Sequence, residues 1–315
     1  MSGYAIGIDV GGTKLAGGVV ELASGRLLAR RVRPTQPERG GEAVLADALA
    51  LAEELLQELE QWGATPDGLG VAVCELVAPD GSIGSGQAVA WQGLPVRERF
   101  AALGPAVVEA DVRAHALAEA RYGAGRPFSL LSFVGVGTGI SACLVQDGRP
   151  FAGARGNALV LASGALRFPC PSCGASSPFV LEAYASGPAL VARYHQRTGH
   201  RVRRAEELVT AADAGDEQAA EVLRSGGAAL GAAVAWLVNV LDPEAVVLGG
   251  GLGAAPGLYW DELVSAARAQ IWAAAGRNLP ILRAQLGADA GVVGAALLGA
   301  GFGNRTEQTL TKQRS

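Results

Sequence analysis

The chain has 315 residues, of which 50% are hydrophobic and 18% charged, and its formal net charge is −4 with a pI near 5.5. This length and apolar content predict a large buried core and about two globular domains. The slightly acidic balance argues against a nucleic-acid partner, because it supplies no basic field. No charged and apolar leader precedes Tyr4, so we expect a cytoplasmic protein.

The first strand, expected over 4–10, runs into a glycine turn that is followed by a second strand at 15–22. A hairpin differs from both a Walker loop and a dinucleotide fingerprint, because those place their glycines at the start of a helix. The turn carries a hydroxyl and an amine on Thr13 and Lys14. From the residues alone it is either a phosphate holder or a tight hairpin that uses glycine for positive φ.

The elements that follow alternate between strand and helix, as in α/β proteins. The helix expected at 42–61 is the clearest, since apolar residues recur at helical spacing between acidic ones. The Gly- and Pro-rich loop from 78 to 95 contains Trp91, and such long loops are usually functional or disordered. In chain order we expect an extended piece near 27–33, the helix, a strand at 69–73, the loop, a strand at 106–109 and a helix at about 112–122.

A second hairpin is expected over 130–145, with a Gly-Thr-Gly turn at its tip. It repeats the arrangement of the first hairpin, in which a glycine turn that carries a threonine joins two strands. This repetition predicts two similar halves of the chain that face a cleft. The uncharged stretch 226–241 is shorter than the ~20 residues of a membrane span, so we expect a buried helix and no membrane partner. The remaining elements are expected at about 180–198, 204–214, 216–241, 245–248 and 292–301.

Five segments, taken in order along the chain, resemble the ROK family of sugar kinases and sugar-responsive repressors. They are 9–14, 111–119, 137–140, 182–187 and 241–251, and together the resemblance covers nearly the whole chain. It implies an α/β fold of the actin-like, hexokinase type. In that fold, two ribonuclease-H-like domains with an interdomain cleft close over ATP and sugar.

The resemblance also predicts how the chain divides. We expect a small domain formed by 1–108 plus about 292–303, a large domain formed by 109–291, and a disordered tail at 304–315. Repressors of the family carry an extra helix-turn-helix at the N-terminus, for which no room is expected before Tyr4. This favours the kinase branch, and the family suggests a homodimer.

Phosphoryl transfer requires mainly positioning and charge stabilisation. We expect Thr13 and Thr138 to bracket the β- and γ-phosphates of ATP, Lys14 to add charge, and Asp9 to hold Mg²⁺ through water. A triple glycine follows the strand at 245–248, and we expect it to let the adenosine approach the backbone closely. The expected ATP-binding residues are Asp9, Gly11, Gly12, Thr13, Lys14, Gly137, Thr138, Gly139, Gly249, Gly250 and Gly251.

Asp111 is the expected catalytic residue, which accepts the proton of the attacking hydroxyl. It directly follows the strand at 106–109 and stands at the expected N-cap of the next helix. From the residues alone, simple N-capping explains this carboxylate equally well. The resemblance favours the catalytic role.

Departures from the family pattern fall on the acceptor side. Ala110 replaces a sugar-binding Asn, while Val160 and Ser163 stand in the places of a sugar-binding Glu and a zinc-binding His. Glu182 matches another sugar-contacting Glu, and Glu75 replaces a Gly and is expected to supply a new polar contact. Each lost hydrogen bond would cost about 1–3 kcal/mol with glucose. We therefore expect an amino, N-acylated or deoxy sugar, or a cyclitol.

Zinc is not expected. Family members often bind it through a His and three Cys, and in this segment only Cys170 and Cys173 remain. Two thiolates do not complete a tetrahedral structural site. Cys74 and Cys143 lie in apolar runs and are expected to be small buried hydrophobic residues.

The leading hypothesis is an ATP- and Mg²⁺-dependent kinase that phosphorylates a primary hydroxyl, of the 6-OH type, on a hexose or modified hexose. The alternative is a catalytically weak sugar-binding or regulatory protein without a DNA-binding domain. A dehydrogenase is disfavoured, since no glycine-rich turn from strand to helix is followed by an acidic residue. The acceptor, and the choice between ATP and polyphosphate as donor, stay open.

Overall fold

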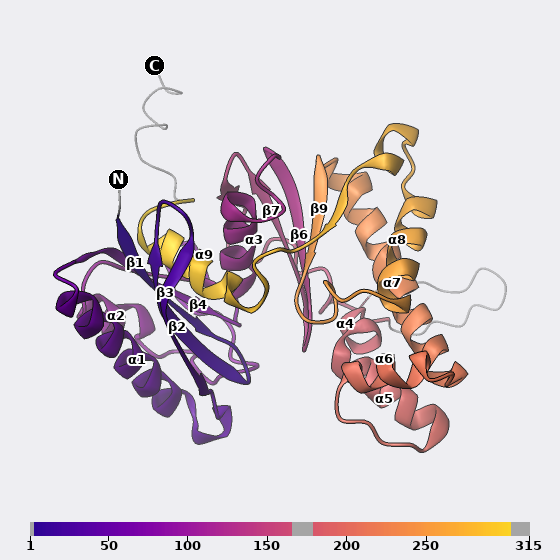
Figure 1. The fold of residues 1–315 in the computed structure, drawn as a ribbon, viewed down its shortest axis with the longest axis horizontal. Coiled ribbons are helices and arrows are strands. Elements are labelled where there is room, and N and C mark those ends of the chain that lie inside the picture. The colour runs from indigo at the N-terminus through magenta and orange to yellow at the C-terminus, as the bar shows by residue number, and fades with distance from the viewer. Residues whose placement is uncertain (1–2, 166–178, 304–315) are drawn as a thin grey trace. The chain divides into compact units, whose positions relative to one another are not determined.

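The computed structural model describes residues 3–165 and 179–303, and the chain forms two compact units (Figure 1). Unit 1 combines the chain up to Ser129 with Val145–Ala158 and the residues from Ala288 onward. Unit 2 combines Leu130–Leu144 with Leu159–Gly287. Both units contain helices and strands, in keeping with the predicted α/β class. The domains expected from the sequence, which divide the chain after 108 and not after 129, stay a prediction.

Unit 1 is built on a mixed five-stranded sheet with the order β3-β2-β1-β4-β5. The β1–β2 and β2–β3 pairs are antiparallel, and the β1–β4 and β4–β5 pairs are parallel. The strands are β1 (Tyr4–Val10), β2 (Lys14–Glu21), β3 (Arg26–Pro34), β4 (Pro66–Val73) and β5 (Ala106–Ala110), and the helices are α1 (Gly41–Gln61), α2 (Val96–Ala101), α3 (Asp111–Tyr122) and α9 (Ala290–Gly299).

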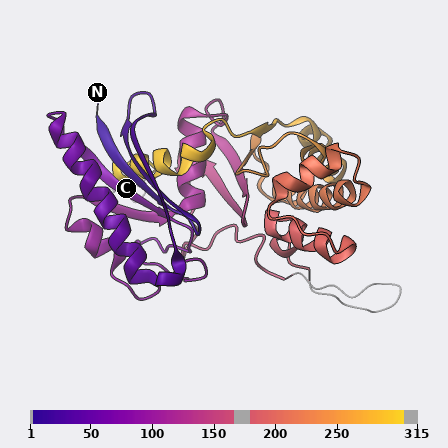
Figure 2. The ribbon, with the colours of Figure 1, turned by 60° about the horizontal axis from the view of Figure 1, so that its bottom comes forward.

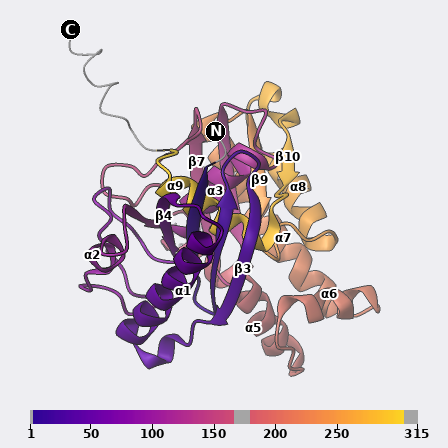
Figure 3. The ribbon, with the colours of Figure 1, turned by 60° about the vertical axis from the view of Figure 1, so that its left-hand side comes forward.

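Helices α1 and α9 cover opposite faces of this sheet (Figures 2 and 3). Alternate residues of β1 explain why, because Ile6 and Ile8 join the core that includes the apolar face of α1, whereas Gly7 faces α9. A Cβ on Gly7 or Gly70 would overlap the backbone of α9, so glycine is required there for the helix to lie directly on the strands. Helix α9 therefore packs directly on β1 and β4.

Unit 2 contains most of the second sheet, which has the order β10-β9-β6-β7-β8. Helices α7 and α8 pack on each other (Figure 1), and their apolar residues form one core with those of β6 and β9. The strands are β6 (Leu130–Val136), β7 (Ile140–Gln146), β8 (Arg149–Pro150), β9 (Ala245–Gly249) and β10 (Ile281–Arg283), and the helices are α4 (Glu182–Ala185), α5 (Gly187–Thr198), α6 (Ala205–Asp213), α7 (Glu217–Leu241) and α8 (Leu258–Gln270). Short 3₁₀ helices occur at Pro37–Arg39, Ala274–Asn278 and Gly287–Asp289.

Among the described residues, α7 is the one helix whose length and composition would allow it to cross a membrane. In unit 2, however, 56% of its most apolar window is buried. The core helix of a folded protein meets the same length and composition test, and α7 packs as such a helix, which agrees with the reading of 226–241 as a buried helix.

Most expected elements agree with the structure to within a few residues. The helix expected at 180–198 is interrupted, because Ser186 is extended and caps α5, and Pro188 stands in the first turn of that helix. Helix α2 and strands β8 and β10 were not predicted, and no bounds were predicted for helix α8. Helix α2 and the two strands are short and carry no strong periodic signal. The tail expected at 304–315 lies outside the described residues.

Candidate functional site

The first glycine hairpin is a tight turn between β1 and β2. The last paired residues are Val10 and Leu15, and the N–H of Gly11 donates to the carbonyl of Lys14 at 2.9 Å. Neither Gly11 nor Gly12 has a positive φ, so a need for backbone freedom does not explain them. A Cβ on Gly12 would make only an ordinary contact, 3.6 Å from the Cβ of Ala88. The fold therefore leaves room beside Gly12, whereas a Cβ on Gly11 would lie 3.3 Å from the carbonyl oxygen of Lys14.

The second glycine hairpin joins β6 and β7 in unit 2. The N–H of Gly137 donates to the carbonyl of Gly139 at 2.9 Å, which leaves Thr138 exposed at the tip. A carboxylate oxygen of Glu182, at the start of α4, accepts from the N–H of Ile140 at 2.8 Å. A Cβ on Gly139 would lie 2.7 Å from the same oxygen. The hydrogen bond from Ile140 N–H to Glu182 therefore holds the hairpin against α4, and glycine at 139 leaves room for the carboxylate.

This hydrogen bond predicts different results for two similar glycines. We expect Gly139→Ala to lower the free energy of unfolding by about 1–3 kcal/mol, because the new methyl group displaces the Glu182 carboxylate from its hydrogen bond. Gly137→Ala is the matched control, since nothing lies within 4 Å of the added carbon and φ is not positive. Thermal denaturation of both variants checks this. Equal losses of stability would contradict the role given to Glu182.

The three glycines at the end of β9 differ in their surroundings: Gly249 and Gly250 contact other parts of the fold, whereas Gly251 is exposed. Gly250 has φ +79°, and a Cβ there would overlap the carbonyl of Val136. The same carbonyl accepts from Leu252 N–H at 3.1 Å and Gly253 N–H at 3.2 Å, so the turn folds back on the end of β6. Gly249 is buried in β9 and faces the Phe133 ring. Only Gly251 is exposed with nothing near its α-carbon that would exclude a side chain.

Asp9 and Asp111 bring two desolvated carboxyl groups together in unit 1. Burial raises the pKa of Asp9 to about 6, His115 counteracts the shift, and the charge of Asp111 adds to it. Burial also raises the pKa of Asp111, again against the effect of His115. Both residues lie at strand ends, Asp9 in β1 and Asp111 directly after β5. Partly buried carboxylates whose charges affect each other are a frequent feature of active sites.

The N-cap position expected for Asp111 is wrong by one residue. Ala110 occupies the N-cap and makes no side-chain hydrogen bond there, while Asp111 is the first residue of α3. One oxygen of Asp111 accepts from the N–H of its neighbour Val112 at 2.6 Å. His115 places Nδ1 2.7 Å from the carbonyl of Asp111, one helical turn away. Helix capping therefore does not account for the second oxygen of Asp111.

Glu75 does not have the role expected from the sequence. Its carboxylate is 5% exposed and accepts four hydrogen bonds, from the hydroxyl of Ser85 and the backbone N–H groups of Gln87, Ala88 and Val89. A carboxylate has about four lone-pair sites, and all are used. No acceptor site is left for a sugar hydroxyl.

The remaining acceptor-side residues lie in both units. Ala110 ends β5 and is buried, with no polar side-chain atom to offer. Val160 and Ser163 are exposed in unit 2, and their segment is tied to Glu182, whose N–H donates to the carbonyl of Ala162 at 3.1 Å. Sugar-binding roles for Glu182, Ala110 and Val160 stay predictions.

The sequence reasoning missed Arg113. This residue is 4% exposed, pairs with Glu109, and donates to the carbonyls of Val77 at 2.7 Å and Gly156 at 2.9 Å. It ties α3, two residues after Asp111, to two loops of unit 1. A single Arg on a helix usually lies in solvent, so no sequence pattern singled it out.

Metal ligands are sparse in the part of the chain that the structure describes. No group of three or more His, Cys, Asp or Glu side chains is placed there to hold a metal ion. Cys170 and Cys173 lie outside the described residues. Cys143 is buried, as expected, and Cys74 is partly exposed. Burial and three neighbouring carboxylates raise the pKa of the Cys74 thiol, so it stays protonated at neutral pH.

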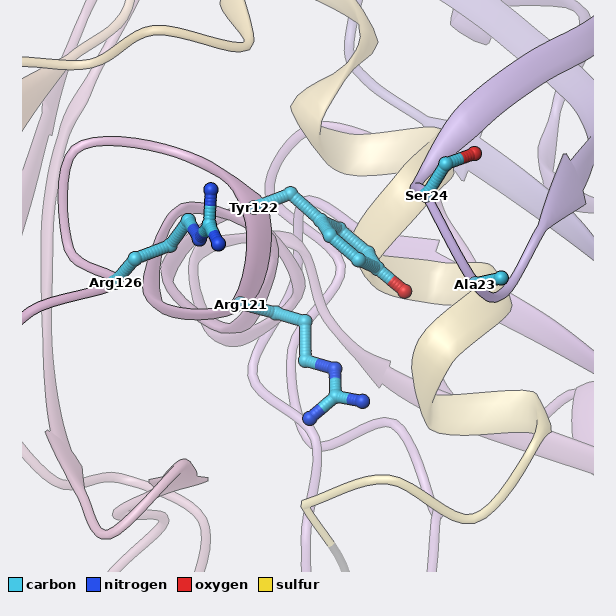
Figure 4. Close-up of a pocket in the computed structure, with 5 residues that line it drawn as sticks. All are labelled: Ala23, Ser24, Arg121, Tyr122 and Arg126. Carbon is cyan, nitrogen blue, oxygen red and sulfur yellow. The ribbon is translucent and has the colours of Figure 1, made fainter. Parts of the chain in front are cut away.

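A pocket of about 460 Å³ in unit 1 lies apart from these residues (Figure 4). Arg121 and Tyr122 come from the end of α3, and Arg126 from the loop after it. The Tyr122 hydroxyl donates to the carbonyl of Leu22 at 2.6 Å. The lining residues are Ala23, Ser24, Arg121, Tyr122 and Arg126, none of which was predicted as a site residue.

A sequence model of the ROK family matches residues 5–301. The chain belongs to the ROK family. A curated ROK relative, the bifunctional enzyme NanE/NanK of Brucella melitensis, is 34% identical over 309 residues. The match covers 96% of this chain and 55% of the relative, so the chain spans about half the length of that protein.

Two solved structures support the ROK fold. A ROK hexokinase from Thermus thermophilus is 33% identical with a TM-score of 0.77, over 99% of this chain and 100% of the other. A ROK glucokinase from Streptomyces griseus, in complex with glucose and AMPPNP, is 28% identical with a TM-score of 0.79, over 94% and 99% of the two chains. The predicted family and the actin-like α/β fold class are confirmed.

Proposed function

We propose that this chain is an ATP-dependent sugar kinase that transfers the γ-phosphate to a primary hydroxyl of a hexose or modified hexose. The observation that carries the proposal is the repeated hairpin. Each unit has one, with an exposed threonine and a main-chain hydrogen bond from its first glycine. A relative of the same fold in complex with glucose and AMPPNP adds support.

The hairpins supply the phosphate contacts in this proposal. Thr13 and Thr138 offer hydroxyl groups, Lys14 offers a positive charge, and the glycines allow the phosphate oxygens to reach backbone N–H groups. Gly251 offers open backbone to the adenosine. Catalysis then depends on positioning and charge stabilisation.

A magnesium ion fits the donor set around Asp9. Mg²⁺ prefers oxygen ligands and is usually held by one or two carboxylates together with substrate phosphates and water. Asp9 is a carboxylate whose ionisation is opposed by burial, and a cation beside it would favour its charged form. We propose that Asp9 holds the ion through water. When bound, the ion neutralises charge on the phosphates.

Asp111 is the proposed base. It accepts the proton of the primary hydroxyl as that oxygen forms a bond to the γ-phosphorus, and the bond to the β-phosphate oxygen breaks to release ADP. The raised pKa of Asp111 suits this task, because it increases the proton affinity of the carboxylate. The hydrogen bond from Val112 N–H keeps one oxygen in place.

The acceptor is expected to be less polar than glucose. Ala110 offers no hydrogen bond, Val160 presents an apolar side chain, and all acceptor sites of Glu75 are taken. Each hydroxyl left without a partner in a closed pocket costs about 1–3 kcal/mol. We therefore propose an aminosugar, N-acylated sugar, deoxy sugar or cyclitol.

An ADP-release assay with a panel of acceptors tests this function. The panel contains glucose, 2-deoxyglucose, N-acetylglucosamine, N-acetylmannosamine, glucosamine and a cyclitol, and each is tried with ATP and with polyphosphate. We expect kcat/KM at least about tenfold higher for one analogue than for glucose, since one hydrogen bond corresponds to roughly that factor. The 6-deoxy form of the preferred hexose is the matched control and should give no product.

Two outcomes would contradict the proposal. A micromolar-to-millimolar KM for glucose with poor use of the analogues would contradict the less polar acceptor. No turnover with any acceptor, together with measurable sugar binding, would favour the catalytically weak regulatory protein. The predicted homodimer and cytoplasmic location stay predictions, which light scattering and cell fractionation would check.

A further inference from the structure

The long loop between β4 and α2 is folded around the Glu75 carboxylate. One oxygen of Glu75 accepts from Ala88 N–H at 2.7 Å and Val89 N–H at 3.0 Å, and the other from Gln87 N–H at 3.1 Å and the Ser85 hydroxyl. Ser85 in turn accepts from Leu76 N–H at 2.9 Å, next to Glu75. We call residues 85–89 the clasped segment. Its position depends on one buried charge.

The clasped segment is fixed at its far end as well. Val89 is 1% exposed, and the fully buried Trp91 donates from Nε1 to the carbonyl of Gly41 at 2.9 Å, at the start of α1. Between the two anchors, Gly86 and Gln87 are exposed. The loop therefore has a short exposed stretch at Gly86 and Gln87. Its conformation is fixed by the buried side chains of Glu75 and Trp91.

The clasped segment lies next to the candidate phosphate turn, and Glu75, which holds it, lies near the proposed base. The Cβ of Ala88 is 3.6 Å from the position that a Cβ on Gly12 would take. Arg113, on the helix that Asp111 begins, donates to the carbonyl of Val77, two residues after Glu75. Val73, two residues before Glu75, pairs with Ala110, the residue before Asp111, so both carboxylates follow the same paired position of β4 and β5.

We propose that Glu75 is a positioning residue for the acceptor, which holds the clasped segment where it contacts the sugar beside Asp111. The inference rests on the proposed kinase function and deepens it. Glu75 touches no substrate, because all its lone pairs bond to the loop. It acts through residues 85–89, and an exposed backbone held in one conformation loses little entropy when a sugar binds.

Steady-state kinetics of Glu75→Gln tests the proposal. The amide replaces one acceptor oxygen with an N–H₂ group, so the clasped segment loses one bond if that group faces Ser85 and Gln87, and two if it faces Ala88 and Val89. We expect the acceptor KM to rise at least about tenfold while the KM for ATP stays within about twofold, since one or two lost bonds loosen only this loop. Glu75→Asp, which keeps the charge, should fall between wild type and Glu75→Gln.

Ser82→Ala is the matched control. Within residues 3–165 and 179–303, its hydroxyl bonds to Asp80 alone, in the same loop, so the kinetics of Ser82→Ala should equal those of the wild type. Hydrogen–deuterium exchange of the free protein supplies a readout that needs no activity. Amides 87–89 should exchange at least about tenfold faster in Glu75→Gln, and the amides of α1 and α9 should not change.

The outcomes separate the two proposals. An active wild type whose acceptor KM is unchanged in Glu75→Gln, or changes in step with the KM for ATP, overturns the positioning role alone. Unchanged exchange at 87–89 overturns it as well. A wild type that is inactive with every acceptor overturns the kinase function and the acceptor role with it. In that case, faster exchange in Glu75→Gln still shows that the clasp holds the loop.

Discussion

Replacing Asp111 with Asn is expected to lower kcat about 10²- to 10⁴-fold, the usual contribution of a positioned general base. The amide keeps the shape of the carboxylate and the hydrogen bond from Val112 N–H, but it cannot take up the proton of the attacking hydroxyl. The KM values for acceptor and ATP should change little. The ADP-release assay with the preferred acceptor measures all three constants.

The same variant carries its own controls. AMPPNP affinity and melting temperature should stay near the wild-type values, because a neutral group in a desolvated position adds no charge penalty. In the wild type, kcat should fall on the acid side at a pH above the ordinary Asp value of about 3.9, since burial raises the pKa of Asp111. Full turnover by Asp111→Asn would remove the proposed base.

Replacing Asp9 with Asn is expected to abolish most activity and yet stabilise the fold at alkaline pH. The folded pKa of Asp9 is raised to about 6, above its unfolded value. The proton held by the folded state therefore favours folding at low pH, and this advantage is lost as the pH rises through about 6. At pH 8 the ionised carboxylate of Asp9 lowers the free energy of unfolding by on the order of 3 kcal/mol, a cost that the neutral amide of Asn avoids.

Denaturant unfolding at pH 4.5 and pH 8 checks this prediction in the absence of nucleotide and metal. We expect Asp9→Asn to be more stable than the wild type by on the order of 3 kcal/mol at pH 8, with most of this difference gone at pH 4.5. Added Mg²⁺ and ATP should narrow the gap at pH 8, because only the carboxylate gains from them. A gap that does not depend on pH would show that Asp9 is not desolvated.

Local patterns predicted the parts of this protein in which neighbours along the chain also interact. The two hairpins follow from alternating strand residues around a short glycine turn, and the turn bonds from Gly11 and Gly137 are the result. Helix α1 follows from its apolar spacing. The family resemblance likewise depended on short motifs, and the match over residues 5–301 confirms it.

Roles that depend on partners far along the chain could not be predicted in this way. Glu75 was expected to face a sugar, but its charge is compensated by four donors that lie 10 to 14 positions later. Arg113 reaches Gly156, 43 positions away. Gly249 and Gly250 were expected to face a ligand, but contacts with Phe133 and Val136 account for them.

The sequence by itself therefore determined the family, the α/β class and the two glycine hairpins, because these features depend on residues that are close together along the chain. Only the tertiary structure decided which charged and glycine residues make contacts within the protein and which stay exposed. The physical reason is that a buried carboxylate must find donors, and a close backbone approach must find glycine, wherever in the chain the fold brings them together.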